Sequence, residues 1–205
     1  MTPSFSIIGR SSSHFTRVVR IFALELEVAH AFEPVSDLRS LLASDYGQNP
    51  SLRMPVLRAG SDEWFGALNI CRALHRMAKR ERRVIWPEQL TTPLLANAQE
   101  LTLQAMATGV ELIMSRDTPA DGSAYATKRR ASLENSLRWL EARIDAALST
   151  LPARDLSYLE VTLYCLTRHL TFRDLVETAS FPRLRAFCEV FEARPSAAAT
   201  PFVFD

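Results

Sequence analysis

Short apolar runs and amphipathic stretches alternate over residues 1–80. Phe5–Ile8 is an apolar run that ends at Gly9, which predicts a buried strand. After a serine-rich turn, apolar residues recur at the spacing of one helix face: Phe15, Val18, Val19, Phe22 and Ala23. The other elements predicted here are a strand over Val28–Val35, a short helix over Leu38–Tyr46, a hairpin of Val56–Arg58 and Glu63–Phe65 across Gly60, and a helix over Ala67–Ala78. This order of elements predicts a small α/β domain with a mixed sheet.

The pattern changes after residue 80, where long helical patterns replace the alternation and no strand is predicted. These helices cover Pro93–Ser115, Ser123–Ser149, Tyr158–His169 and Phe181–Arg194, and a loop rich in Pro, Asp and Gly, Asp117–Gly122, separates the first two. The second helix carries an apolar stripe of Leu133, Leu137, Leu140, Ile144 and Leu148. We therefore predict an α/β domain over residues 1–80, a linker over 81–91 and an all-helical domain, an antiparallel bundle, over 92–205.

A capping box begins the third of these helices. The Ser157 hydroxyl is expected to cap the amide of Glu160, and the Glu160 side chain is expected to return to the Ser157 amide. Leu156 and Val161 are placed to form the accompanying hydrophobic staple. Loss of such a cap costs about 1 kcal/mol of stability, so this motif is structural.

Composition and charge exclude several classes of protein. The chain is 47% hydrophobic and 23% charged with a formal net charge of +1, which is ordinary for a globular protein and gives no footprint for nucleic acid or an anionic membrane. No apolar run approaches the roughly 18 residues of a membrane span, and no cationic segment with an apolar core begins the chain as a secretion signal would. We expect a soluble cytoplasmic protein.

The cysteines and histidines do not form a recognisable chemical motif. Cys71, Cys165 and Cys188 are odd in number and far apart, which favours a reducing compartment over a disulfide framework. The absence of a CxxC pair excludes a thioredoxin-type dithiol mechanism. The spacing of the four histidines predicts no metal site: His14, His30, His75 and His169.

The segment Asn49–Leu57 contains the most informative pair, Met54-Pro55. A proline cannot donate to a sheet ladder, so Pro55 is expected at the first position of a strand, at an edge or in a cis bend. Such a bend leaves the main-chain N–H and C=O of Met54 available to a ligand. This is the layout of a thioredoxin-like fold that binds a peptide-like ligand through its main chain.

Six short segments are each weak motifs, but their order and spacing along the chain are specific when taken together. They are Gly9–Arg20, Asn49-Pro50, Met54-Pro55-Val56-Leu57, Leu156–Glu160, Phe181-Pro182 and Arg194-Pro195-Ser196. Together they resemble the cytosolic glutathione S-transferases of bacterial type, over nearly the whole chain. In that family the proline that corresponds to Pro55 is characteristically cis. The sequence differs from the family at Glu160, where Asp is more usual. The resemblance implies a thioredoxin-like N-terminal domain followed by an all-helical C-terminal domain.

The resemblance also implies a function and a site. It implies glutathione as the substrate that is joined to a small-molecule electrophile, and a homodimer that pairs the small domain of one subunit with the helices of the other. Ser13 stands where the family often has its catalytic serine, although a serine there is also a good helix cap, and Ser11 and Ser12 are alternatives for facing the thiol. Arg53 is a candidate for the glycine carboxylate of glutathione, or is simply solvated.

One departure from the family lies just after the fourth strand. The family usually carries an acidic residue and a serine there, which hold the γ-glutamyl end of glutathione, and these positions fall here on Gly66 and Ala67. Neither has a hydrogen-bonding side chain, so only the free amides of a helix N-terminus remain for the carboxylate. Three hypotheses stay open: a transferase that uses Ser13, a non-catalytic binding module of the same fold, and a stress- or transcription-associated partner protein.

Overall fold

The computed structural model describes residues 5–116 and 118–204, which its contacts divide into two units. The first unit is Met1–Arg82 together with Glu192–Asp205, and the second is Arg83–Phe191. The sequence-based division into 1–80, 81–91 and 92–205 stays a prediction. The contacts differ from it in one respect, because they group the last residues of the chain with the first unit rather than with the helices.

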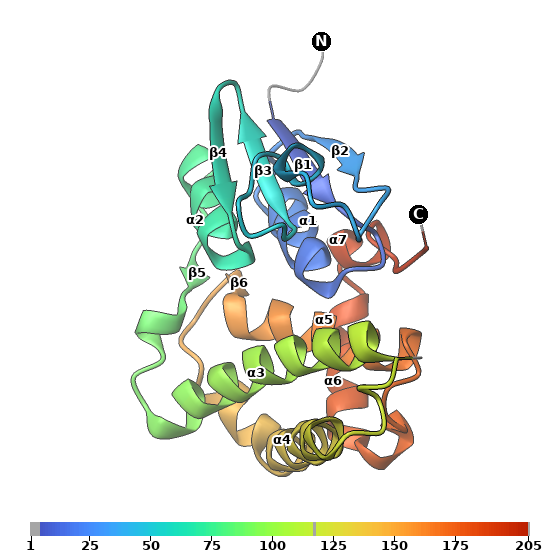
Figure 1. The fold of residues 1–205 in the computed structure, drawn as a ribbon. Coiled ribbons are helices and arrows are strands. Elements are labelled where there is room, and N and C mark those ends of the chain that lie inside the picture. Colours follow the sequence, from blue (N-terminus) through green and yellow to red (C-terminus); the bar gives the residue numbers. More distant parts are fainter. Residues whose placement is uncertain (1–4, 117, 205) are drawn as a thin grey trace. The chain divides into compact units, whose positions relative to one another are not determined.

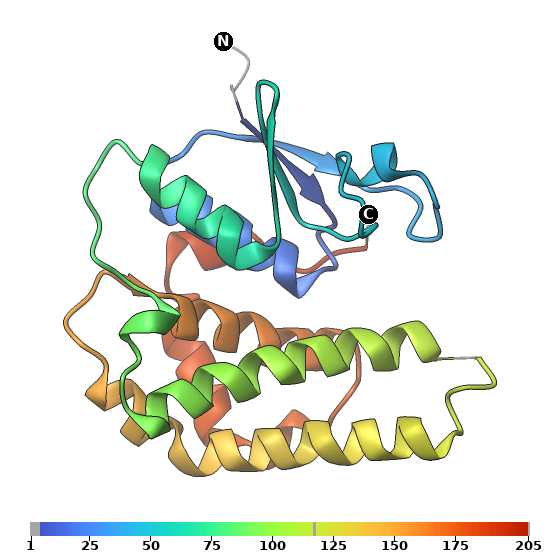
Figure 2. The ribbon, with the colours of Figure 1, turned by 60° about the vertical axis from the view of Figure 1, so that its left-hand side comes forward.

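A mixed four-stranded sheet forms the centre of the first unit. Its elements are β1 (Phe5–Gly9), α1 (His14–Glu25), β2 (Ala31–Pro34), β3 (Val56–Ala59), β4 (Asp62–Phe65), α2 (Ala67–Met77) and α7 (Pro195–Ala198), labelled in Figure 1. The strand order is β2-β1-β3-β4, with β1 parallel to β2 and antiparallel to β3, and with β3 and β4 forming the predicted hairpin. Helices α1 and α2 lie side by side on one face of this sheet (Figure 2).

The predicted helix over Leu38–Tyr46 is wrong, because only one 3-10 turn forms there, η1 (Ala43–Tyr46). The amide of Leu42 donates to Ser40 Oγ at 3.1 Å, a local bond that competes with a helical ladder. Leu41 and Leu42 are 84% and 64% exposed, so the segment buries too little apolar surface to stabilise a longer helix.

The second unit is dominated by four helices. Its elements are β5 (Val84–Ile85), η2 (Pro87–Gln89), α3 (Pro93–Ser115), α4 (Ala124–Thr150), β6 (Leu156–Ser157), α5 (Tyr158–Phe172), η3 (Thr178–Ser180) and α6 (Pro182–Glu192). Helices α3 and α4 run antiparallel as neighbours (Figure 2), and α5 packs against α3. The stripe predicted on α4 is buried at Leu133, Leu137, Leu140 and Ile144. Within the described residues, no helix combines the length and apolar character needed to cross a membrane.

Two short strands contradict the expectation that no strand follows residue 80. β5 pairs in parallel with β6, which joins Val84 to Leu156 across the helical unit. Asp155 fixes this pairing, because its amide donates to Arg83 O at 2.9 Å and its Oδ2 accepts from the amide of Arg83 at 2.8 Å. Strands of two residues show no alternation in the sequence, so the hydrophobic pattern could not reveal them.

Of the two hydrogen bonds predicted for the capping box of α5, one is confirmed and the other has a different donor. Ser157 Oγ accepts from the amide of Glu160 at 3.1 Å, as predicted. The Glu160 carboxylate accepts from Ser157 Oγ at 2.7 Å rather than from the Ser157 amide, and Arg154 binds it through Nη2 at 2.6 Å and Nε at 2.8 Å. The carboxylate therefore joins the cap to the preceding loop through a bidentate ion pair.

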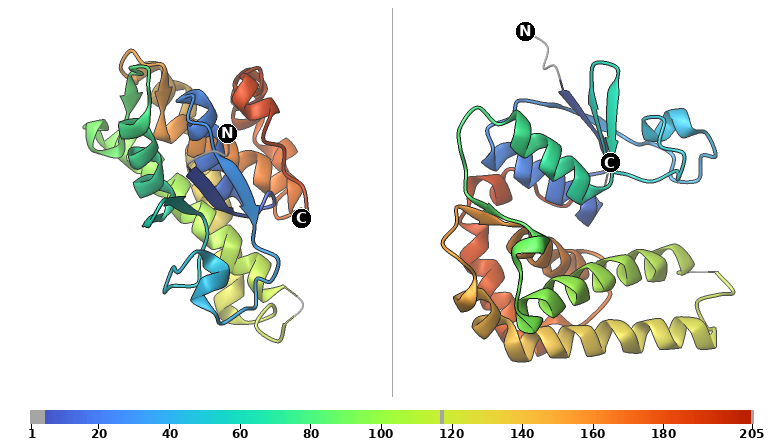
Figure 3. Two further views of the ribbon diagram at one scale, coloured as in Figure 1. Left: turned by 90° about the horizontal axis from the view of Figure 1, so that it is seen from above. Right: turned by 90° about the vertical axis from the view of Figure 1, so that its left-hand side faces the viewer.

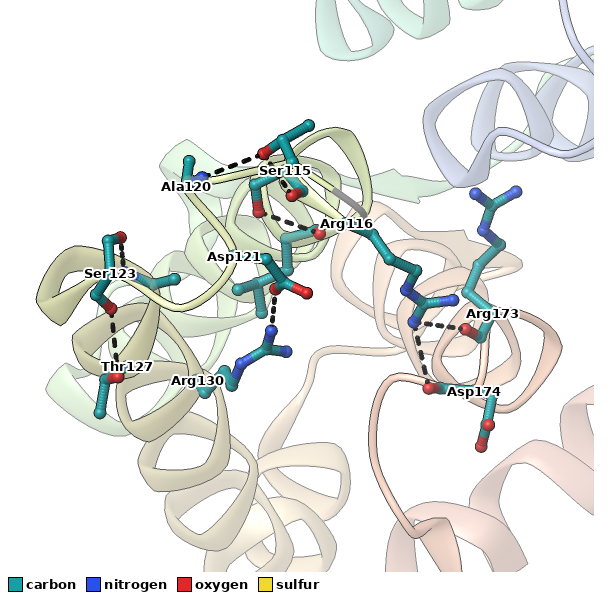
Figure 4. A network of polar contacts seen from close by, with 12 residues as sticks. Ser115, Arg116, Ala120, Asp121, Ser123, Thr127, Arg130, Arg173 and Asp174 are labelled. Carbon is teal, nitrogen blue, oxygen red and sulfur yellow. Dashed lines mark hydrogen bonds and ion pairs between the residues drawn. The ribbon is translucent and has the colours of Figure 1, made fainter.

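Polar contacts also hold the loop that joins α3 to α4, which was predicted over Asp117–Gly122. Asp117 itself lies outside the described residues. Figure 4 shows Arg116 reaching from the end of α3 to the end of α5, where its Nη2 donates to Arg173 O at 3.1 Å and Asp174 O at 3.3 Å. Beside it, Asp121 pairs with Arg130 of α4. These contacts fix the ends of three helices of the second unit.

Candidate functional site

One row of the sheet ladder brings the predicted site segments to a common edge. Val56 of β3 pairs with Ile8 of β1 on one side and with Phe65 of β4 on the other. Because β3 runs antiparallel to both neighbours, its beginning lies beside the ends of β1 and β4. The turn that follows β1, the Met54-Pro55 pair that precedes β3 and the Gly66-Ala67 pair that follows β4 therefore leave the sheet at the same edge.

Ser13 is the N-cap residue of α1. Its Oγ accepts from the amide of Thr16 at 3.3 Å, and its side chain is half-buried. A hydroxyl that accepts in a cap keeps its own hydrogen, so Ser13 can still donate to a ligand. In the same turn, Ser11 Oγ accepts from Arg20 Nη1 at 3.3 Å, and Ser12 is half-buried. The structure thus places all three serines in one turn, with Ser13 at the start of the helix.

The approach of this turn to α1 depends on Gly9. A Cβ at Gly9 would stand 2.5 Å from Oγ1 of Thr16, which is far closer than two such atoms can lie. The Thr16 Oγ1 also accepts from the amide of Arg10 at 3.4 Å. Glycine at residue 9 therefore lets the first turn of α1 pack directly onto the end of β1, and this packing positions Ser13.

Met54 presents its main chain at the same edge. The Met54–Pro55 peptide bond is cis, Pro55 is buried, and the Met54 side chain packs against the cluster of Ile8, Val35, Tyr46 and Val56. Among the described residues, neither the N–H nor the C=O of Met54 has a hydrogen-bond partner. This is the arrangement that main-chain binding of a peptide-like ligand requires.

Asn49 holds the loop that leads to Met54, a role that the sequence analysis did not assign. Its side chain is 3% exposed; Nδ2 donates to Arg53 O at 2.7 Å, and Oδ1 accepts from the amide and the hydroxyl of Ser51 at 3.1 and 2.7 Å. The Asn49-Pro50 motif could have indicated this role, but it was interpreted only as one of the motifs that resemble the family. The Arg53 side chain is exposed, and its carbonyl is the group that Asn49 fixes.

Tyr46 belongs to the cluster against which Met54 packs, and it is a neutral phenol. Burial, reinforced by the negative charges of Asp37 and Asp45, raises its pKa above the ordinary value of a tyrosine. The hydroxyl donates to Asp37 O at 3.3 Å. Tyr46 therefore supports the Met54 side chain and supplies no phenolate to the site.

Gly66 and Ala67 begin α2 without a side-chain cap. Gly66 has φ +83° and ψ 136°, a positive-φ conformation that glycine adopts without strain, and a Cβ there would meet nothing within 4 Å. Ala67 is buried, and the first turn of α2 holds no acidic residue. The amides at this end are thus oriented for an anion, while neither residue offers a group that would bind an ammonium.

The structure contains no competing metal centre among residues 5–116 and 118–204, where no group of three or more His, Cys, Asp or Glu side chains comes together. A surface hollow in the second unit is lined by the loop after α5, at Thr171, Asp174, Leu175, Val176, Glu177 and Thr178. This lining includes two carboxylates but no thiol, imidazole or amine. The edge of the sheet in the first unit therefore remains the candidate site.

Comparison with known proteins gives the class of the fold. No protein-family model and no curated protein sequence matches the chain. A glutathione S-transferase from Methylobacterium radiotolerans JCM 2831, in complex with glutathione sulfonate, is 20% identical with a TM-score of 0.74, covering 98% of this chain and 96% of that one. A glutathione transferase family member from Pseudomonas fluorescens Pf-5, with bound glutathione, is 20% identical with a TM-score of 0.76, covering 97% and 98%.

A third solved structure belongs to an isomerase. It is a maleylacetoacetate isomerase from Methylobacterium extorquens AM1 with bound malonate and glutathione, 18% identical with a TM-score of 0.71, covering 95% of each chain. These likenesses show that the chain has the glutathione S-transferase fold, a thioredoxin-like domain joined to an all-helical domain. The fold predicted from the sequence is confirmed.

Proposed function

We propose that the protein binds glutathione and joins its thiolate to small apolar electrophiles, with Ser13 stabilising the thiolate. The observation that carries this proposal is the row of Ile8, Val56 and Phe65, which brings the serine turn, the Met54 main chain and the start of α2 to one edge of the sheet. The compared structures with bound glutathione or its sulfonate support glutathione as the ligand.

In this proposal the Met54 main chain pairs with the cysteinyl part of glutathione in the manner of an added strand. The amides at the start of α2 receive the γ-glutamyl carboxylate. The exposed Arg53 side chain is available for the glycine carboxylate. This orientation directs the thiol toward the turn that contains Ser13.

Ser13 would then act on the thiol through its hydroxyl hydrogen. The thiol loses its proton to water, and the Ser13 O–H donates to the resulting thiolate beside the positive end of α1, which lowers the pKa of the thiol. The thiolate sulfur forms a bond to the electrophilic carbon, and the leaving group departs with the electron pair of the bond that breaks. In an addition reaction, the neighbouring atom of the electrophile takes up a proton instead.

A second function has its own support in Gly66 and Ala67. Without an acidic side chain for the γ-glutamyl amine, a charge-assisted bond worth about 1.5–3 kcal/mol is missing, so the affinity for glutathione falls by about one to two decades. A non-catalytic module that binds another peptide-like ligand through Met54 would tolerate that loss. Calorimetric titration with millimolar glutathione, followed by a conjugation assay, separates the two functions. Undetectable binding would exclude the transferase.

Restoring a hydroxyl at residue 67 should strengthen glutathione binding. Ala67→Ser places a donor in the first turn of α2, and one added hydrogen bond of about 1 kcal/mol should lower the Kd about fivefold. The Kd is measured by calorimetric titration with S-methylglutathione, which has no free thiol. Ala67→Cys, nearly equal in volume and a weak donor, serves as the matched control, and equal affinities for the two variants would contradict the binding site proposed at α2.

We also propose that the protein is a homodimer. The exposed Leu41 and Leu42 of the loop before η1 favour burial against a second copy of the chain. The variant with serine at both positions should therefore run as a monomer in gel filtration with light scattering. Val190→Ser, which changes an apolar residue that is 77% exposed on α6, is the control and should remain a dimer. A wild-type mass near the 23.0 kDa of one chain would disprove the dimer.

A further inference from the structure

The C-terminal segment of the first unit is held along α1 by contacts of residues 194–202. At the last turn of α1, Glu25 Oε2 accepts from Arg194 Nη1 at 3.1 Å, and Glu25 Oε1 accepts from Ser196 Oγ at 2.5 Å. The Glu25 side chain is only 17% exposed, so these charge-assisted bonds are partly shielded from water. One end of the segment is thus held by a single carboxylate.

Arg17 holds the same segment near the first turn of α1. This residue is 6% exposed, and its Nη2 donates to Ala197 O at 3.2 Å. Its Cζ lies 4.4 Å from the centre of the Phe202 ring, within the range in which a guanidinium is attracted to the face of an aromatic ring. Phe202 is therefore placed by Arg17 and is not merely the end of a loose tail.

The residue that holds Phe202, Arg17, lies close to the turn that contains Ser13. The amide of Arg17 donates to Ser13 O at 3.0 Å, so the two residues lie one helical turn apart on the same face of α1. Side chains of a helix lean toward its N-terminus, so the Arg17 side chain leaves the helix on the side of the serine turn. Figures 1 and 3 agree that the C-terminal segment passes beside the connection between β1 and α1.

We propose that Phe202 is a specificity-determining residue of the proposed transferase, and that it forms an apolar wall beside Ser13 for the electrophile. One part of the ring rests on Arg17, and the ring is half-buried, so part of its surface remains open to a ligand. An aromatic ring prefers an aromatic or bulky apolar partner. The favoured electrophiles therefore carry an aromatic group within a few bonds of the reactive carbon. This inference rests on the proposed function.

Two electrophiles with the same reactive group test the inference. Benzyl isothiocyanate and methyl isothiocyanate both accept the thiolate at the central carbon while the nitrogen takes up a proton, and they differ in the aromatic ring. Phe202→Ala should lower kcat/KM for the benzyl compound about tenfold and change that for the methyl compound less than about twofold. The Kd for glutathione should stay within about twofold of the wild type.

Two further variants control for folding and for general effects of the tail. Phe202→Leu retains most of the apolar volume and should lose less than about threefold toward the benzyl compound. Phe204→Ala deletes the same ring two positions further on, where the side chain is 69% exposed, and should leave the ratio of the two rates unchanged. Equal losses with both electrophiles in Phe202→Ala, or the same change of ratio in Phe204→Ala, would overturn the inference alone. A wild-type protein that binds no glutathione would overturn it together with the proposed function.

Discussion

Replacement of Ser13 by alanine is expected to slow glutathione conjugation about 10- to 100-fold while glutathione still binds, because the lost bond to the thiolate is charge-assisted and worth about 1.5–3 kcal/mol. The main chain of Met54 and the start of α2 do not depend on the Ser13 hydroxyl, so the Kd should change little. A conjugation assay with benzyl isothiocyanate and a calorimetric titration with glutathione give the two quantities.

The cap that Ser13 forms must be separated from its chemical role. Ser123 is the matched control, because it caps α4 in the same way, with Oγ accepting from the amide of Ala126 at 3.1 Å. Both Ser13→Ala and Ser123→Ala should lose about 1 kcal/mol of stability, and only the first should lose rate. Ser13→Thr, which keeps hydroxyl and cap, should retain most of the rate. A large loss in Ser11→Ala or Ser12→Ala with none in Ser13→Ala would move the role to that serine.

Replacement of Asn49 by alanine is expected to lower the free energy of unfolding by about 2–4 kcal/mol and to weaken glutathione binding at least tenfold. The variant removes three hydrogen bonds that the buried Asn49 side chain makes to Arg53 and Ser51, each worth about 0.5–1.5 kcal/mol. The loop before Met54 then loses the contact that sets its path. Urea denaturation and calorimetric titration measure the two effects.

The variant Asn49→Asp separates the acceptor function of this side chain from its donor function. A carboxylate can still accept from Ser51 but cannot donate to Arg53 O, so an intermediate loss is expected. Asn135, exposed on α4 with its Oδ1 accepting from Arg138 Nη1 at 3.0 Å, provides the control, since Asn135→Ala should change neither quantity by much. Wild-type stability and affinity in Asn49→Ala would show that the loop keeps its path without this residue.

The fold was predictable to the extent that its elements leave a period in the sequence. The buried face of α1 and the stripe of α4 recur at helical spacing, and both helices form as predicted. The helix predicted at Leu38–Tyr46 fails, because local side-chain bonds and exposed leucines outweigh its pattern. β5 and β6 could not be found at all, since two residues define no period and their pairing depends on Asp155.

The candidate site was predictable as a set of motifs but not as an arrangement. The sequence indicated Ser13, Met54 and a start of α2 without a hydrogen-bonding side chain. Only the structure shows the strand register at Val56, which brings these segments to one edge of the sheet. The role of Asn49 depends on hydrogen bonds to Arg53 and Ser51 that no spacing rule specifies. The residues of α1 and residues 194–202 are too far apart in the sequence for any local pattern to indicate that they are in contact.

Those distant contacts have a consequence for how the protein folds. The bond from Arg17 to Ala197 spans 180 residues, and that from Glu25 to Arg194 spans 169, with the whole helical unit between them. Contacts of high sequence separation form late, because the intervening chain must be ordered before its ends can meet at low entropic cost. We therefore expect helix α1 to acquire its last anchors after the helices have assembled, which would make the serine turn one of the final parts of the molecule to reach its native position.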